Sequence, residues 1–233
     1  ARLPIKGVIW YQGESNAGRA WQYREAFPLL IRDWRRLWGS EFPFLFVQLA
    51  NWEAGKGDAN TGSDWAELRE AQALTLQLPR TGMAVTIDIG ESKDIHPKNK
   101  HDVGLRLAHE ARRIAYGENL APGSPPPPRV QFSADTAYAY FELPAPGLMV
   151  RDSAGAAQGF ELAGEDRVFH PAQAVVEGAT IRAWSAAVPK PLALRYAWAD
   201  DPQGLNVYTR EGFPLAPFRS DDWPCKTRDG RFE

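Results

Sequence analysis

Residues 10–17 read Trp10-Tyr11-Gln12-Gly13-Glu14-Ser15-Asn16-Ala17, and they follow a short apolar run at residues 5–9. The apolar run predicts a buried strand, whereas the small and polar residues after it cannot continue a strand ladder. We therefore expect backbone N–H groups and an amide side chain at the carboxyl edge of a sheet. Ligands bind at this edge in open α/β sheets. The stretch thus predicts a fold class and the place of a site.

The first half of the chain alternates between apolar runs and segments with helical spacing. The apolar runs predict strands at residues 5–11, 42–49 and 83–89. Apolar residues at helical spacing predict helices at residues 20–38, 64–78 and 99–116. Pro28 is expected to kink or divide the first helix. Strands that alternate with helices predict an α/β fold with a parallel sheet and helices packed on its faces.

The character of the sequence changes near residue 122. A run of four prolines at residues 125–128 predicts a stiff, extended connector. Short alternating segments follow between turn signals, at residues 129–133, 137–143, 149–152, 160–163, 173–177, 180–184 and 192–197. Such spacing is typical of an antiparallel β-sandwich. We therefore expect an α/β domain at residues 1–120 and a small all-β, sandwich-like module at residues 121–233.

The composition narrows the classes of partner. The chain has 233 residues and a net charge of −2, which gives no electrostatic reason to expect nucleic acid or an anionic membrane. No apolar run approaches the roughly 20 residues that span a bilayer. Cys225 is the single cysteine, so an internal disulfide is excluded, and four histidines without ligand-like spacing argue against a metal site. We expect no metal and no cofactor.

A second polar cluster, Asp94-Ile95-His96-Pro97, follows the third apolar run. Pro97 biases His96 toward an extended backbone, which would project the imidazole from the end of the strand. Asp94 is near enough in sequence to orient the ring and stabilise an imidazolium, as the acid of a catalytic triad does. Asp88 is a competing acid. The alternative is a solvated loop in which Asp94 only caps a turn.

Gly13 and Asn16 are candidates for an oxyanion-binding loop. Glycine lets a backbone N–H approach a substrate oxygen closely, and the asparagine amide supplies a second donor. An ordinary turn is the alternative. Ser15 sits in a near match to a Gly-x-Ser-x-Gly nucleophile elbow. A true elbow leads directly into a helix, whereas residues 17–19 are expected to prolong the loop, so Ser15 is the less favoured nucleophile.

Several long blocks of the sequence resemble the sialate O-acetylesterase family of carbohydrate esterases, within the SGNH/GDSL hydrolase superfamily. The blocks are residues 10–17, residues 94–100 with Val103-Gly104, and residues 194–202, 206–208 and 211–221. The resemblance covers nearly the whole chain. It implies the C-terminal part of an SGNH-hydrolase-like, three-layer, parallel-sheet domain, followed by the small β module.

The resemblance implies a role for each candidate residue. Gly13 and Asn16 fall on the family's oxyanion donors, His96 on its catalytic histidine and Asp94 on its acid. Ser15 does not fall on the nucleophile, which belongs to an earlier Gly-Gln-Ser-Asn-type block that this chain lacks. The resemblance therefore implies a chain that misses an N-terminal portion with the nucleophilic serine. A periplasmic or secreted location is only a tendency of the family.

The expected substrate is an acetyl ester on a sugar, and which sugar stays open. Tyr11, Gln12 and Trp52 are candidate sugar contacts. Two other interpretations remain: a carbohydrate-binding fragment without catalysis, and a self-sufficient esterase that uses Ser15.

Overall fold

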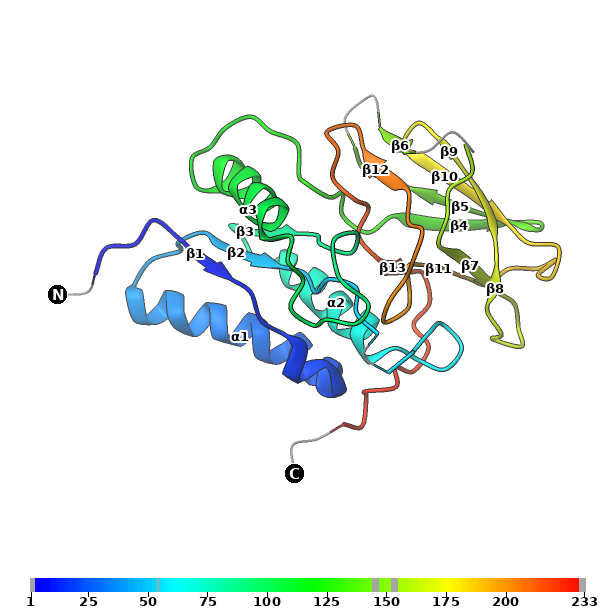
Figure 1. Cartoon of the computed structure of the whole chain (residues 1–233), viewed down its shortest axis with the longest axis horizontal. Coiled ribbons are helices and arrows are strands. Elements are labelled where there is room, and N and C mark those ends of the chain that lie inside the picture. The colour runs from blue at the N-terminus through cyan, green and yellow to red at the C-terminus, as the bar shows by residue number, and fades with distance from the viewer. Residues whose placement is uncertain (1–2, 54, 144–146, 152–154, 231–233) are drawn as a thin grey trace.

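The computed structural model describes residues 3–53, 55–143, 147–151 and 155–230 (Figure 1). It has an α/β first half built on a parallel sheet, and a second half of antiparallel strands. Among the described residues, no helix combines the length and apolarity needed to cross a bilayer.

The parallel sheet contains three strands, each shorter than the apolar run that predicted it. They are β1 (Val8–Trp10), β2 (Phe44–Val47) and β3 (Thr81–Ala84), in the order β1-β2-β3. Both strand pairs are parallel, as the alternation with helices predicted. The carboxyl ends of all three strands therefore meet at one edge of the sheet.

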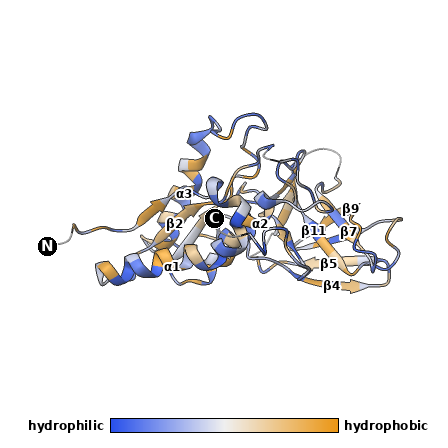
Figure 2. Cartoon of the chain, turned by 90° about the horizontal axis from the view of Figure 1, so that it is seen from below, coloured by the Kyte–Doolittle hydropathy of each residue, from blue (hydrophilic) through white to orange (hydrophobic). Residues whose placement is uncertain are grey.

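Helices cover both faces of this sheet, because the strands are apolar on both sides. The helical elements are η1 (Glu14–Arg19), α1 (Ala20–Trp38), α2 (Asp64–Leu74), η2 (Thr75–Gln77) and α3 (Lys100–Ile114). α1 and α2 share a core with one face of the sheet, and α3 shares a smaller core with the other. α1 is amphipathic: Tyr23, Phe27 and Ile31 are buried, and its exposed face carries polar residues together with a few apolar ones, among them Leu29 and Leu37 (Figure 2).

Two local expectations need correction: the loop at residues 17–19, and the division of the first helix at Pro28, whose alternative, a kink, stays a prediction. Residues 14–19 form a 3₁₀-helix that runs directly into α1, where a loop was expected. α1 is also a single helix that contains Pro28. Proline removes one backbone hydrogen bond, but the buried side chains on both sides of Pro28, Phe27 and Ile31, pack in the core and hold the helix together.

The second half folds into antiparallel strands around its own core. The strands are β4 (Arg129–Ser133), β5 (Thr136–Tyr140), β6 (Leu148–Val150), β7 (Phe160–Ala163), β8 (His170–Pro171), β9 (Gln173–Glu177), β10 (Thr180–Trp184), β11 (Ala193–Tyr196), β12 (Val207–Thr209) and β13 (Phe218–Arg219). They form sheets in the orders β4-β5-β10-β9, β13-β11-β7-β8 and β12-β6. One hydrophobic cluster contains residues from all three sheets.

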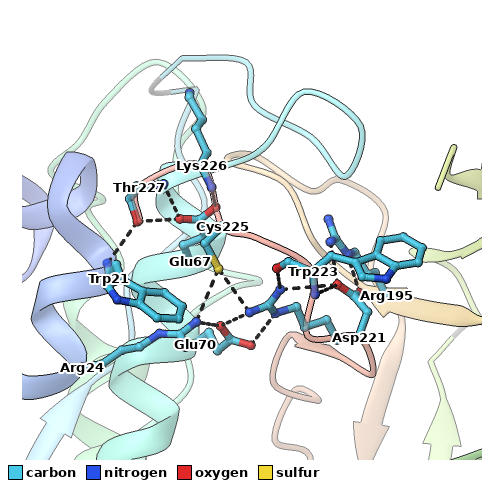
Figure 3. Close-up of polar contacts among 11 residues, drawn as sticks. Trp21, Arg24, Glu67, Glu70, Arg195, Asp221, Trp223, Cys225, Lys226 and Thr227 are labelled. Atoms are coloured by element: carbon cyan, nitrogen blue, oxygen red, sulfur yellow. Dashed lines mark hydrogen bonds and ion pairs between the residues drawn. The ribbon is translucent and has the colours of Figure 1, made fainter. Parts of the chain in front are cut away.

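The C-terminal segment, residues 220–230, returns to the first half of the chain (Figure 3). Glu67 on α2 is buried and accepts hydrogen bonds from the backbone N–H groups of Lys226 and Thr227, at 2.6 and 2.9 Å. The Thr227 hydroxyl accepts from the backbone N–H of Trp21 on α1, at 3.0 Å. These contacts bind the end of the chain to both helices on that face of the sheet.

Candidate active site

The loop after β1 is built around Gly13, which is buried against α2. Its φ of +154° lies in a region that favours glycine. A Cβ at this position would stand 2.8 Å from Cδ2 of Leu68, so a larger residue does not fit. The Gly13 carbonyl accepts a hydrogen bond from the backbone N–H of Asn16 at 2.8 Å. The sequence thus folds residues 13–16 into a tight turn at the sheet edge.

The Asn16 side chain is held from one side. Nε2 of Gln12 donates to Oδ1 of Asn16 at 2.7 Å. The Tyr23 hydroxyl donates to Oε1 of Gln12 at 2.9 Å. Nε2 of Gln72, from α2, donates to the backbone carbonyl of Gln12 at 3.2 Å. With its oxygen occupied by Gln12, the Asn16 amide directs its N–H donors elsewhere.

Asp94 and His96 lie on the loop that follows β3. Oδ1 of Asp94 accepts a hydrogen bond from the backbone N–H of His96 at 2.8 Å, which closes an Asx turn. The same oxygen lies 3.8 Å from Nδ1 of the imidazole, which is too long for a hydrogen bond. The His96 side chain is 88% exposed. The carboxylate therefore stands beside the ring, and the ring faces open space.

Asp88, the competing acid, has other partners. Arg106 on α3 binds its carboxylate in a bidentate pair at 2.5 and 2.8 Å, and the Tyr208 hydroxyl donates to it at 3.1 Å. Both charged side chains of this pair are only 10% exposed. Asp88 thus joins α3 and β12 to the segment that follows β3, whereas the carboxylate of Asp94 lies beside His96.

The loops at the sheet edge are tied together through Asn51. Its Oδ1 accepts from the backbone N–H of Gly90 at 2.8 Å, and its Nδ2 donates to Oδ1 of Asp201 at 2.7 Å. The backbone N–H of Glu53 donates to the carbonyl of Ser92 at 3.0 Å. A segment of the second half of the chain therefore supports the loop that carries His96. Sequence reasoning missed Asn51 and assigned no role to Asp201, although Asp201 lies within one of the quoted blocks.

Asp200 fixes the loop after β2. Its carboxylate accepts from the backbone N–H groups of Gly55 and Gly57 at 2.9 and 2.8 Å, and from the Ser63 hydroxyl at 2.5 Å. Arg69 on α2 is fully buried. It donates to the carbonyls of Leu49, Ala50, Ala199 and Asp200. The carboxyl end of β2 is thereby held to both α2 and the second half of the chain.

The three candidate sugar contacts and Ser15 differ in setting. Tyr11 is half-buried, and Nζ of Lys100 stands 5.1 Å above its ring, which brings the start of α3 next to the loop after β1. Burial raises the pKa of Tyr11 to about 12, assisted by Glu14. Trp52 lies against Trp65 at 4.9 Å between ring centroids. Gln12 is half-buried, and Ser15 is exposed on η1. These assignments stay predictions.

The described part of the chain contains no group of three or more His, Cys, Asp or Glu side chains placed to hold a metal ion. The chemistry that the two loops offer consists of hydrogen-bond donors on one side and a carboxylate beside an imidazole on the other. This equipment suits the transfer of an acyl group.

Comparisons of sequence and structure match this chain to carbohydrate esterases. Residues 1–113 match the family described as carbohydrate esterase, sialic acid-specific acetylesterase. The sialate O-acetylesterase of Mus musculus is 38% identical over 152 residues, which cover 57% of this chain and 28% of that protein. The Homo sapiens protein of the same name is 36% identical over the same length.

A solved structure matches more of the chain. It is a carbohydrate acetylesterase from Xanthomonas citri, with 50% sequence identity and a TM-score of 0.89 over 94% of this chain and 51% of that one. The chain thus spans about half of the solved esterase and about a quarter of the curated relatives. These matches confirm the resemblance to the sialate O-acetylesterase family of carbohydrate esterases that was inferred from the sequence blocks.

Proposed function

We propose that this chain forms the histidine-bearing and oxyanion-binding side of a carbohydrate O-acetylesterase site. One observation carries the proposal: the loop with Gly13 and Asn16 and the loop with Asp94 and His96 leave the same edge of one parallel sheet. Parallel strands place their carboxyl ends together, and ligands bind there. The match of residues 1–113 to the family of sialic acid-specific acetylesterases supports an acetyl ester as the substrate.

The proposed mechanism follows from acyl-transfer chemistry. His96 takes the proton of a serine hydroxyl, and the serine oxygen attacks the acetyl carbonyl. The Gly13 N–H and the Asn16 amide stabilise the oxyanion of the tetrahedral intermediate. His96 then returns the proton to the sugar oxygen, which leaves. Water repeats the steps on the acyl-enzyme and releases acetate. Asp94 orients the imidazole and stabilises its protonated form.

We place the nucleophilic serine outside the 233 residues. Within the described sheet, β1 pairs only with β2, so its other edge is open. Ile9, at the centre of β1, is 66% exposed, whereas parallel strands are normally buried on both faces. A further parallel strand at this edge, with a connecting helix packed on the α3 face, would cover Ile9. Its carboxyl end would lie beside Gly13, where a serine could reach both the oxyanion donors and His96.

Ser15 is the alternative nucleophile. Its place on a 3₁₀-helix that enters α1 directly is closer to an elbow than the loop expected from the sequence. The Ser15 hydroxyl would then attack the ester, and its neighbours Gly13 and Asn16 would donate hydrogen bonds to the carbonyl oxygen of that ester. A carbohydrate-binding role without catalysis is the third possibility, and sugar binding without turnover would favour it.

The test uses a protein that contains these residues together with the segment that carries the proposed serine. The substrates are p-nitrophenyl acetate and an O-acetylated sialic acid. We expect turnover of both, lost by several orders of magnitude in His96→Ala and reduced roughly 100- to 1,000-fold in Asn16→Ala. His109→Ala is the matched control, because its imidazole instead contacts the carbonyl of Ala121. Full activity in His96→Ala would overturn the proposal.

A further inference from the structure

Tyr23 and Gln12 form a short hydrogen-bonded relay that ends at Asn16. We propose that these two side chains are positioning residues, which orient the Asn16 amide so that its N–H group faces the substrate oxyanion. The inference rests on the proposed function, in which Asn16 donates a hydrogen bond to the oxyanion. It also gives Gln12 a role that does not require contact with the sugar.

The relay runs in one direction along three side chains. The Tyr23 hydroxyl donates to Oε1 of Gln12 at 2.9 Å. Nε2 of Gln12 then donates to Oδ1 of Asn16 at 2.7 Å. An amide that accepts through its oxygen must direct its nitrogen to the opposite side. The Asn16 donors therefore point away from Gln12, and a free donor is what an oxyanion site needs.

The opposite orientation of the relay is less favourable because of Trp10. Its indole nitrogen can only donate, and it lies near the Tyr23 hydroxyl without forming a hydrogen bond to it. If the Gln12 amide were turned over, a second N–H would face the same hydroxyl oxygen. The hydroxyl proton would then have to use the carbonyl of Gln12, at 3.5 Å. The observed direction gives each proton a better acceptor.

The relay is also mounted on rigid elements. Tyr23 lies on α1, is only 5% exposed and stacks on Phe27 at 5.2 Å. The backbone of Gln12 is fixed by Gln72, which is itself buried and accepts from the backbone N–H of Leu49 at 2.9 Å. A side chain held by packed neighbours loses little freedom when it binds a transition state. The relay thus fixes the Asn16 amide relative to α1 and α2.

The effects on turnover follow from the bonds removed. Tyr23→Phe deletes one neutral hydrogen bond, so we expect kcat to fall roughly two- to tenfold with little change in KM. Gln12→Glu replaces the donor by a carboxylate oxygen, which repels Oδ1 of Asn16 and favours a turned amide. We expect its loss of kcat to approach that of Asn16→Ala. Tyr196→Phe, which removes a buried hydroxyl without a partner, is the matched control and should leave kcat unchanged.

A double-mutant cycle in the protein that contains the serine separates this inference from the proposed function. If the relay acts through Asn16, Tyr23→Phe loses its effect on kcat once Asn16 is alanine. The same loss with and without Asn16 would mean a general structural effect and would overturn the inference. No effect of Asn16→Ala by itself would instead refute the oxyanion assignment, and with it the proposed function.

A second measurement needs no turnover and uses the 233-residue chain. The side-chain amide signals of Gln12 and Asn16 are followed by ¹⁵N–¹H NMR in the wild type, Tyr23→Phe and Tyr196→Phe. We expect Tyr23→Phe to shift both pairs of amide signals and Tyr196→Phe to shift neither. Unchanged Asn16 signals in Tyr23→Phe would contradict the relay, whatever the activity of the longer protein.

Discussion

At the scale of single residues, a few small or polar side chains determine the geometry of the site. Gly13 lets the loop after β1 lie directly against Leu68 on α2. Asp94 closes the turn that presents His96, and Asn51 joins that turn to its neighbours. The sequence singled out the first two as candidates, because glycine and an aspartate near a histidine carry local signals, and their roles in catalysis stay predictions. Asn51 has no such signal, since its partners lie far away in the chain.

Gly13→Ala tests the close approach of this loop to α2. The new Cβ would meet Leu68 at 2.8 Å, and the alanine would have an unfavourable φ. We therefore expect the free energy of unfolding to fall by about 1–3 kcal/mol. Gly18→Ala is the matched control, because its nearest neighbouring atom is 4.0 Å away. Chemical denaturation measures both. Equal stability of the two variants would contradict the described packing.

Alkaline titration tests the burial of Tyr11 and Tyr23. Burial raises the pKa of each phenol to about 12, from an ordinary value of 10. A raised folded-state pKa means that the stabilisation is complete below pH 10 and is lost as the pH rises through 12. We expect unfolding free energy to decline over this interval, and less so in Tyr23→Phe. If the tyrosinate absorbance of these two residues appeared near pH 10 in the folded chain, the burial of the two phenols would be contradicted.

At the scale of elements, the sequence predicted the order of strands and helices in the first half and most strands of the second. It did so because apolar periodicity is a local property. Of the missed strands, β8 and β13 have only two residues, which is too short for any period to show, and β12 has three. The 3₁₀-helix at residues 14–19 was missed for a similar reason, since its polar sequence also suits a loop.

The open edge of β1 gives a prediction at this scale. Ile9 faces away from α1 and is 66% exposed, whereas its neighbour Val8 packs against the core shared with α1. In the 233-residue chain, Ile9→Asp should change the melting temperature little, and Val8→Asp should lower it strongly. In the protein that includes the proposed additional strand, Ile9→Asp should destabilise as well. Equal tolerance of Ile9→Asp in both proteins would argue against a strand at this edge.

At the scale of the whole molecule, both halves of the chain contribute to the candidate site. Asp200 and Asp201 come from the second half, and they hold the loops after β2 and β3. A further hydrophobic cluster contains Ala66 of α2 together with Ala193 and Trp198. Sequence reasoning placed a domain boundary near residue 120 from the change in composition, and whether the halves fold independently stays a prediction. Polar contacts across 130 or more residues have no local pattern that could reveal them.

Asp200→Ala measures what this connection contributes. The change removes the acceptor for two backbone N–H groups and the Ser63 hydroxyl, all at the buried junction. We expect a loss of about 2–4 kcal/mol in unfolding free energy. Asp33→Ala, on the exposed face of α1, should stay within about 0.5 kcal/mol of the wild type. A loss that small in Asp200→Ala would mean that the second half does not support the site.

We propose that this chain supplies the base, the acid and the oxyanion donors, while the nucleophile lies elsewhere. The most direct test is hydrolysis of p-nitrophenyl acetate by the 233-residue chain, shown to be folded by circular dichroism, beside its His96→Ala and Ser15→Ala variants. We expect the chain and both variants to hydrolyse the ester no faster than buffer alone does. Turnover that disappears in both variants would contradict it and would make Ser15 the nucleophile.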